Sequence, residues 1–225
     1  MSKRGSLILI EGLDRTGKST QADLIVNEFE NAGKKVELIK FPDRTTEIGK
    51  LINQFLVDKN FNLPKESIHL LFSANRWELK SQLLEKLLQG VNLIMDRYYY
   101  SGIAYSTANG LDFDWCKSPD IGLPKPDLVL FLTFKDNENV NKLKNRENYG
   151  EERYEITEFQ QEVKKNFETF FNKEEKQRLQ SSNSKADFEI VYVDNKTIEE
   201  VKTDVLGLVK KFIEVDNTNP VEYFQ

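Results

Sequence analysis

The sequence predicts an α/β fold in which a five-stranded parallel sheet carries helices on both faces. Short apolar runs rich in β-branched residues alternate with longer segments of helical period, which is the rhythm of β-α-β units. Some of the runs are continuously apolar, such as residues 128–132 (LVLFL), and this pattern indicates strands buried on both faces. The strands are expected at residues 7–10, 36–39, 91–95, 128–132 and 189–193.

Helical patterns fill the segments between and after these strands. Gly33 and Gly90 follow two of the patterns and can end a helix with a left-handed backbone. The segment 180–186 (QSSNSKA) predicts a mobile surface loop, and the polar residues from 216 onward predict a loosely held tail. The helices are expected at residues 17–31, 47–57, 64–89, 138–144, 157–176 and 198–213.

Composition favours one globular domain. A chain of 225 residues with 39% apolar and 31% charged residues can bury one substantial core. No repeat or linker divides it, so we expect a single domain over residues 1–225, with a core at about 6–212 and a polar tail at 216–225. The lone Cys116 and the lone His69 leave no zinc set and no Ser-His-Asp relay, which excludes much hydrolase and metalloenzyme chemistry.

Charge and hydropathy limit the partners. The net charge of -5 argues against a surface that binds nucleic acid as a whole, because that needs many cations facing phosphates. The apolar run behind the basic N-terminus spans only residues 7–10, too short for a signal-peptide core or a membrane span. We therefore expect a soluble intracellular protein, cytoplasmic and/or nuclear, with no nucleic-acid or membrane partner.

The first chemical motif lies directly after the first predicted strand. Residues 12–19 read GLDRTGKS and fit the phosphate-binding pattern GxxxxGK[ST], with a helical pattern following. The glycines let backbone N–H groups curl around phosphate oxygens, and the helix N-terminus adds a favourable dipole. Lys18 would reach the transferring phosphates and Ser19 would ligate magnesium. The alternative, a glycine turn without a ligand, would not require Lys18.

Two charged residues stand inside this loop, where the terminal phosphate of a bound ATP would lie. An arginine at position 15 can stabilise the negative charge of phosphoryl transfer, as an arginine finger supplied in cis. The bland alternative for Arg15 is a solvated surface charge. Asp14 is better explained as a hydrogen-bond acceptor, either for a sugar hydroxyl of the acceptor or for Arg15.

Asp96 and Arg97 follow the predicted strand at 91–95. Both side chains would emerge at the carboxyl end of that strand, where open α/β sheets bind ligands and where the loop at 12–19 also opens. Asp96 could orient the magnesium shell through water, and Arg97 could bridge the donor and acceptor phosphates. The pair is a weak pattern by itself and gains weight from its place beside the loop.

Aromatic and arginine side chains predict an acceptor site near the same edge. Phe41 and Arg44 follow the second strand, and Phe72 and Arg76 lie four residues apart, on one face of a helix. An aromatic plane beside an arginine fork could take a pyrimidine base, although Phe72 alone would more often belong to the core. Three residues just past position 97 add a glycine that permits close approach and another ring: Ser101, Gly102 and Tyr105.

A charged stretch with a central glycine, residues 146–155 (RENYGEERYE), has the character of a lid at about 145–156. A lid that closes over phosphates excludes water, which would otherwise accept the phosphoryl group. Arg146 and Arg153 stand against four glutamates, so this lid is poorly suited to supply all the cationic charge of the transition state, which favours Arg15. The alternative is a solvated loop between helices.

Three other classes of protein could share parts of these motifs. A GTPase would need NKxD, and none of the three NK pairs, at 141, 172 and 195, is followed by that aspartate. A deoxynucleoside kinase would need a general base for a sugar hydroxyl, whereas a phosphate acceptor is already anionic. A catalytically silent nucleotide-binding module is disfavoured by the intact Lys18, Ser19 and Arg15.

The assembled motifs resemble those of the eukaryotic thymidylate kinases over about residues 6–212. The resemblance rests on EGLDRTGKSTQ, FPDRTTEIGKLI, LLFSANRWE, DRYYYSGIAY, DWCKSPDIGLPKPDLVLFL and GEERYE. It implies the P-loop NTPase fold of the nucleoside monophosphate kinases and a homodimer. It also implies in-line transfer of the terminal phosphate of ATP, bound with Mg²⁺, to dTMP, giving dTDP for dTTP biosynthesis.

The resemblance also implies the ligand contacts. Arg44 and Arg97 would hold the phosphate of dTMP, Arg76 would reach the base edge, Phe72 would stack on the base, and Tyr105 would crowd the position of a ribose hydroxyl. The full set of dTMP contacts would be Asp14, Phe41, Arg44, Phe72, Arg76, Arg97, Ser101, Gly102, Tyr105 and Tyr154. ATP would contact Gly12, Arg15, Thr16, Gly17, Lys18, Ser19, Thr20, Arg146, Asn195 and Lys196.

Within these sets, a smaller group would carry the reaction. The catalytic residues would be Asp14, Arg15, Lys18 and Arg97. The metal would be held by Ser19 and, through water, by Asp96. Arg153 is left with two alternatives, since it could assist transfer or pair with a neighbouring glutamate.

Overall fold

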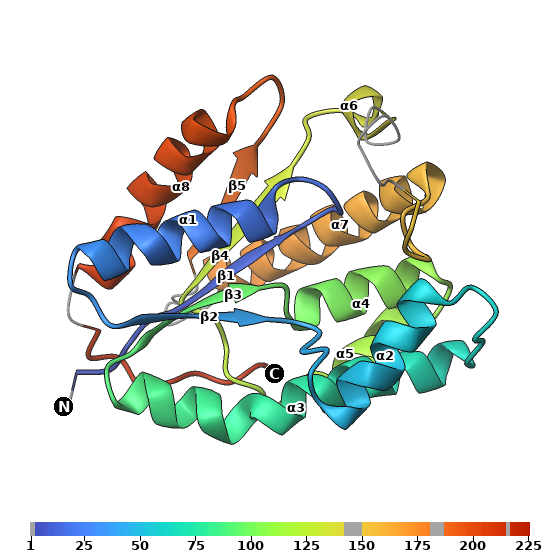
Figure 1. The fold of residues 1–225 in the computed structure, drawn as a ribbon, viewed down its shortest axis with the longest axis horizontal. Coiled ribbons are helices and arrows are strands. Elements are labelled where there is room, and N and C mark those ends of the chain that lie inside the picture. The colour runs from blue at the N-terminus through green and yellow to red at the C-terminus, as the bar shows by residue number, and fades with distance from the viewer. Residues whose placement is uncertain (1–2, 142–149, 181–186, 215–216) are drawn as a thin grey trace.

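The computed structural model describes residues 3–141, 150–180, 187–214 and 217–225. Its centre is a five-stranded sheet in the order β2-β3-β1-β4-β5, and every neighbouring pair is parallel (Figure 1). The strands are β1 (Leu7–Gly12), β2 (Val36–Lys40), β3 (Asn92–Asp96), β4 (Leu128–Thr133) and β5 (Asp187–Tyr192). The predicted fold class is therefore confirmed.

Helices cover both faces of the sheet, α1 and α8 on one face and α3, α4 and α7 on the other (Figure 1). Their bounds are α1 (Lys18–Asn31), α2 (Glu47–Val57), α3 (Lys65–Leu88), α4 (Tyr99–Ala108), α5 (Phe113–Lys117), the 3-10 helix η1 (Ser118–Asp120), α6 (Asn137–Asn141), α7 (Thr157–Gln180) and α8 (Ile198–Ile213). In the described ranges, no helix combines the length and the apolar character that crossing a membrane requires.

The central strand shows why the sheet is buried on both sides. Successive side chains of a strand point to opposite faces, so Leu7 and Leu9 enter one apolar cluster while Ile8 and Ile10 enter the other. All four are essentially inaccessible to solvent. Each such side chain contributes roughly 1.5–3 kcal/mol by leaving water, which explains why a run with no polar alternation forms a stable strand here.

Most of the long helices were predicted from the sequence. The predicted patterns match α1, α2, α3, α6, α7 and α8 with bounds that differ by a few residues, and α6 is described only to Asn141. Helix α4 and the short helices after it were not predicted. Helix α4 begins with aromatic residues that favour strands, and its apolar side chains lie around the helix rather than along one stripe.

The C-terminal tail contradicts the prediction that it is loosely held. The N–H of Arg4 donates to the carbonyl of Asn217 at 2.9 Å, and Phe224 exchanges backbone hydrogen bonds with Gly122 and Leu123. The Phe224 ring is buried and stacks on Tyr99 with centroids 4.1 Å apart. The prediction was wrong because it rested on the polar composition of the tail, which does not reveal that one aromatic side chain and a few backbone hydrogen bonds hold it in place. The predicted loop at 180–186 lies, apart from its first residue, outside the described residues.

Candidate functional site

The site lies where the parallel strands end. Register places Ile10 of β1 opposite Asp96 of β3, so the loop after β1 and the residues after β3 open at the same edge. Gly12, Arg15 and Gly17 all have positive φ, which curls the loop between β1 and α1. A side chain at Gly12 would place its Cβ 2.1 Å from the carbonyl oxygen of Leu132, so this position requires glycine.

Lys18 is buried at the start of α1, and its ammonium donates to the carbonyl oxygen of Leu13. Burial lowers its pKa to about 8, and the nearby Arg97 acts in the same direction, while Asp14 and neighbouring carboxylates oppose the shift. An anion that reached this loop would relieve the cost of a buried cation. The loop is thus poised for a negatively charged ligand.

Ser19 and Asp96 lie side by side at the mouth of the loop, and the Ser19 hydroxyl donates to one carboxylate oxygen of Asp96. The other oxygen, Oδ1, is buried with no hydrogen-bond partner. A hydroxyl next to a carboxylate with one unsatisfied oxygen fits Mg²⁺, which prefers oxygen ligands and keeps several waters. Among the described residues, no group of three or more His, Cys, Asp or Glu side chains could hold a metal ion alone. Phosphate and water oxygens would therefore have to complete the shell.

Arg97 is the centre of a polar network next to the loop. It adopts a left-handed φ of 67° and its guanidinium pairs with Asp14. The same guanidinium contacts the hydroxyls of Ser101 at 3.3 Å and Tyr105 at 3.4 Å, and Gln160 donates to Asp14 at 2.7 Å. The cation paired with Asp14 is therefore Arg97, not Arg15, which was the partner considered from the sequence.

Asp14 is ionised in this network. Burial alone would raise its pKa, but Arg97 and Lys18, together with hydrogen bonds from Tyr105 and Gln160, lower the pKa below the ordinary value. The carboxylate can accept hydrogen bonds but has no proton to give. This agrees with the predicted role as an acceptor.

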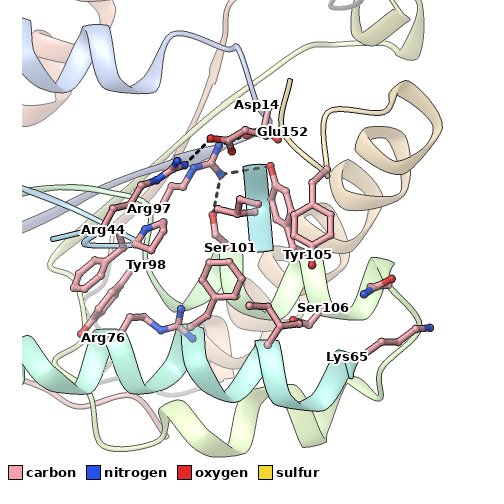
Figure 2. Close-up of a pocket in the computed structure, with 18 residues that line it drawn as sticks. Asp14, Arg44, Lys65, Arg76, Arg97, Tyr98, Ser101, Tyr105, Ser106 and Glu152 are labelled. Carbon is pink, nitrogen blue, oxygen red and sulfur yellow. Dashed lines mark hydrogen bonds and ion pairs between the residues drawn. The ribbon is translucent and has the colours of Figure 1, made fainter. Parts of the chain in front are cut away.

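A single pocket beside this network gathers all ten residues predicted to contact thymidylate (Figure 2). Asp14, Arg44, Arg97 and Glu152 lie at one end of the pocket, and Arg76 and Lys65 of α3 lie at the other end with Ser106 of α4 (Figure 2). The predicted members are Asp14, Phe41, Arg44, Phe72, Arg76, Arg97, Ser101, Gly102, Tyr105 and Tyr154, and Tyr98, Ser106, Asn109 and others complete the lining.

The deep end of the pocket is built on a buried ion pair. Arg76 donates from Nε and Nη2 to the two oxygens of Asp120, at 3.0 and 2.7 Å, and Ser73 donates to the same carboxylate. A Cβ added to Gly102 would lie 2.7 Å from an Arg76 nitrogen, so a larger residue here would push this guanidinium out of its present position. The sequence reasoning missed Asp120, because its only signal was membership of the DWCKSPDIG stretch.

The described part of the lid reaches two of the site's arginines. Arg15 donates from Nε to Glu155 at 2.7 Å, and Arg44 donates from Nη2 to Glu152 at 2.7 Å. Arg15 does not line the pocket, but stands between the loop and the lid. Tyr154 stacks on Phe159 and meets Tyr105 edge-on, which brings the lid against the pocket wall.

Arg153 follows neither alternative considered for it. Its guanidinium donates to the backbone carbonyls of Phe55, Asp58 and Phe61 at 2.8–3.0 Å and lies over the Phe55 ring. These contacts tie the lid to the end of α2. Arg146 lies outside the described residues.

The predicted adenine contacts Asn195 and Lys196 line a second hollow, at the carboxyl ends of β4 and β5. Lys196 pairs there with Asp204 at 2.6 Å, and Asn195 has a left-handed φ of 55°. The structure therefore separates these two residues from the pocket while keeping them at the same edge of the sheet.

Glu11 is a site residue that the sequence reasoning missed. Its buried carboxylate accepts the N–H groups of Tyr98 at 2.8 Å and Ser101 at 3.0 Å, and also the Ser101 hydroxyl. It thereby satisfies amides at the start of α4 that have no partner inside the helix. Burial raises its pKa, although the Ser101 hydroxyl and Arg97 partly offset that effect. No local sequence pattern identifies this role of Glu11, because its partners lie about ninety residues away in the chain.

Comparison with known proteins adds a family to this geometry. The sequence model of the family described as thymidylate kinase matches residues 10–204. The thymidylate kinase of Schizosaccharomyces pombe is 49% identical over 212 residues, covering 93% of this chain and 94% of the relative. The enzyme of Danio rerio is 44% identical over 97% of this chain and 96% of its own length, and that of Homo sapiens is 49% identical over 71% and 74%.

A solved structure resembles the fold over its full length. The thymidylate kinase of Candida albicans, whose structure was described as revealing the origin of broad substrate specificity, matches with a TM-score of 0.85. The two sequences are 42% identical, and the match covers 100% of both chains.

Proposed function

This chain belongs to the thymidylate kinase family, and on that premise we propose how its residues transfer the terminal phosphate of ATP to dTMP, giving dTDP. One observation supports the assignment most directly. The ten residues matched to thymidylate contacts line one pocket, and the end of that pocket at Asp14 and Arg97 adjoins the phosphate-binding loop.

On the donor side, the backbone of the loop and the start of α1 would receive the triphosphate of ATP. The contacts are Gly12, Arg15, Thr16, Gly17, Lys18, Ser19 and Thr20, with Arg146, Asn195 and Lys196 toward the adenine. Ser19 and, through water, Asp96 would hold Mg²⁺, which when bound neutralises phosphate charge. Lys18, already a buried cation, would exchange its bond with the Leu13 carbonyl for phosphate oxygens.

On the acceptor side, Arg44 and Arg97 would hold the phosphate of dTMP at the end of the pocket nearest the loop. Glu152 now occupies one donor of Arg44, so the incoming phosphate would share or displace that carboxylate. Phe72 would stack on the base and Arg76 would reach its edge, with Tyr105 against the sugar. Asp14 would accept a hydrogen bond from the sugar or keep Arg97 in place.

The transfer itself would depend on position and charge. The phosphate of dTMP is anionic at neutral pH, so it needs no general base, and an ionised Asp14 fits a role as acceptor. Arg15 would leave Glu155 for the transferring phosphoryl group, where it would stabilise the charge on the equatorial oxygens. The lid would exclude water from this charge.

We test the assignment with a nucleotide panel. Purified protein with ATP and magnesium should convert dTMP to dTDP well, dUMP less well and thymidine not at all, measured by coupled release of ADP. Chelation of magnesium by EDTA should abolish turnover and readdition should restore it. Turnover of thymidine without turnover of dTMP would replace this assignment with a deoxynucleoside kinase.

We also propose a homodimer. Large apolar side chains are exposed on α2 and α3, among them Leu51, Val57, Leu70 and Trp77, and contact with a second copy of the chain would remove them from water. Sedimentation equilibrium of the purified protein at micromolar concentration should give twice the mass of one chain, and a mass of one chain would contradict the proposal.

A cytoplasmic and/or nuclear location, without nucleic-acid or membrane partners, stays a prediction from the sequence.

A further inference from the structure

Arg97, which would hold the phosphate of dTMP, has a backbone conformation that needs support. Its φ of 67° lies in the left-handed region, which is unfavourable for a residue that carries a side chain. Such a conformation persists only where neighbouring contacts fix it. The contacts that fix Arg97 come from the end of β1.

Two consecutive residues of β1 hold the two peptide groups that flank the Cα of Arg97. The N–H of Arg97 donates to the carbonyl oxygen of Ile10 at 3.0 Å. The N–H of Tyr98, in the next peptide group, donates to Oε1 of Glu11 at 2.8 Å. Because φ and ψ are the rotations between two planar peptide groups, holding both N–H groups fixes the backbone of Arg97.

Glu11 also supplies the cap that α4 lacks. Tyr98, which precedes the first residue of α4, makes no side-chain capping hydrogen bond. Oε1 of Glu11 accepts the N–H of Ser101 at 3.0 Å as well as that of Tyr98, and the first turn of a helix has no internal partner for these groups. A carboxylate from β1 therefore fixes the start of α4, immediately after Arg97.

The other oxygen of Glu11 reaches the side chain of Arg97 through a hydroxyl. Oε2 accepts the hydroxyl proton of Ser101, so the Ser101 oxygen presents only lone pairs to its other neighbours. Nη1 of Arg97 lies 3.3 Å from that oxygen (Figure 2) and 3.4 Å from the carbonyl oxygen of Gly12. The last residues of β1 thus hold both the backbone and the guanidinium of Arg97.

The place of Glu11 in the chain connects this support to the reaction. Glu11 is fully buried and is followed directly by Gly12, where the phosphate-binding loop begins. One side chain therefore joins the loop that would receive ATP to the arginine that would hold the acceptor phosphate. Phosphoryl transfer depends on the alignment of donor and acceptor, so a change in this link should change the rate.

We propose that Glu11 is a positioning residue for phosphoryl transfer, which holds Arg97 in its left-handed conformation and thereby fixes the acceptor phosphate against the phosphate-binding loop. Glu11 touches no substrate in this account and acts only through Arg97. The inference rests on the proposed function, because it requires Arg97 to hold the phosphate of dTMP.

The test compares kcat/KM for dTMP at saturating ATP and magnesium. Glu11→Ala removes the contacts with both N–H groups and should lower kcat/KM about tenfold. Glu11→Gln keeps one oxygen for these N–H groups but removes the negative charge, so its kcat/KM should stay within about threefold of the wild type. A value for Glu11→Gln as low as that of Glu11→Ala would overturn the inference, because the charge rather than the backbone contacts would be the cause.

A double-variant cycle with Arg97 separates positioning from a purely structural role. If Glu11 acts through Arg97, adding Glu11→Ala to Arg97→Ala should change kcat/KM by less than about twofold. A general loss of structure would lower kcat/KM by the same factor in both backgrounds, and that result would overturn the inference. Should Glu11→Ala not fold, Glu11→Asp takes its place in the cycle, because its shorter side chain withdraws the carboxylate from the two N–H groups.

Asp127 provides the matched control, because its carboxylate supports the opposite end of β1. It accepts the N–H of Leu7 at 2.8 Å and pairs with Arg4. Asp127→Ala should lower the thermal midpoint, as Glu11→Ala does, but leave kcat/KM for dTMP within about twofold of the wild type. An equal loss of kcat/KM in Asp127→Ala would overturn the inference, because lost stability alone would then explain the effect. Wild-type protein that does not phosphorylate dTMP would instead refute the proposed function on which the inference rests.

Discussion

Replacement of Arg15 by alanine is expected to lower kcat by about 10³-fold or more, because arginine fingers contribute 10³–10⁵ to phosphoryl transfer. Arg15 stands inside the phosphate-binding loop with a left-handed φ of 63°, and its guanidinium is held by Glu155 of the lid. In the part of the lid that the structure describes, Arg153 is committed to backbone carbonyls at the end of α2. Among the described residues, the phosphate-binding loop is therefore where we expect the cationic charge of the transition state to come from.

The measurement is single-turnover phosphorylation of dTMP at saturating ATP and magnesium, which isolates the chemical step from product release. Arg15→Lys keeps the charge but loses the planar fork, so its rate should fall between the wild type and Arg15→Ala. Lys165→Ala, an exposed change on α7 away from the site, serves as the control with an unchanged rate. A rate for Arg15→Ala within a few-fold of wild type would remove Arg15 from the mechanism.

Arg97→Ala should damage both stability and substrate binding. Loss of Arg97 leaves the Asp14 carboxylate largely buried without its partner cation. This should lower the free energy of unfolding by about 3 kcal/mol. The value is at the lower end of the range for a buried ion pair, because both side chains are 20% exposed. The KM for dTMP should rise about tenfold to a hundredfold, because a charge-assisted contact with the phosphate is lost. Urea unfolding and initial rates give the two quantities.

A double variant tests the stated cause. If the unpaired carboxylate is the source of the instability, Arg97→Ala with Asp14→Asn should be more stable than Arg97→Ala alone, by about 1 kcal/mol or more, since the pair is coupled. The second change should not restore the KM for dTMP, because no cation returns to the phosphate. Additive losses of stability in the double variant would show that the charge of Asp14 is not the cause.

The amino-acid sequence alone determined the elements whose signals are local. Apolar runs marked the five strands, and those of β1 and β4 are continuous because strands buried on both faces need no polar alternation. Gly12, Lys18 and Ser19 identified the phosphate-binding loop, because a glycine-rich turn with a lysine, placed between a strand and a helix, is typical of loops that bind phosphate. The roles of individual pocket residues were inferred from the resemblance to the thymidylate kinases. The local pattern could not assign them, because an aromatic side chain four residues from an arginine is also found on helices that only pack in a core.

Only the tertiary structure decided which side chains meet. Glu11 satisfies the start of α4, Asp120 holds Arg76, His69 hydrogen-bonds with Ser106, and Phe224 anchors the tail on Tyr99. These partners are separated by between 37 and 125 residues in the chain. A hydrogen bond or ion pair across such distances leaves no periodic trace in the sequence, because the fold, rather than neighbouring residues, brings the two groups together.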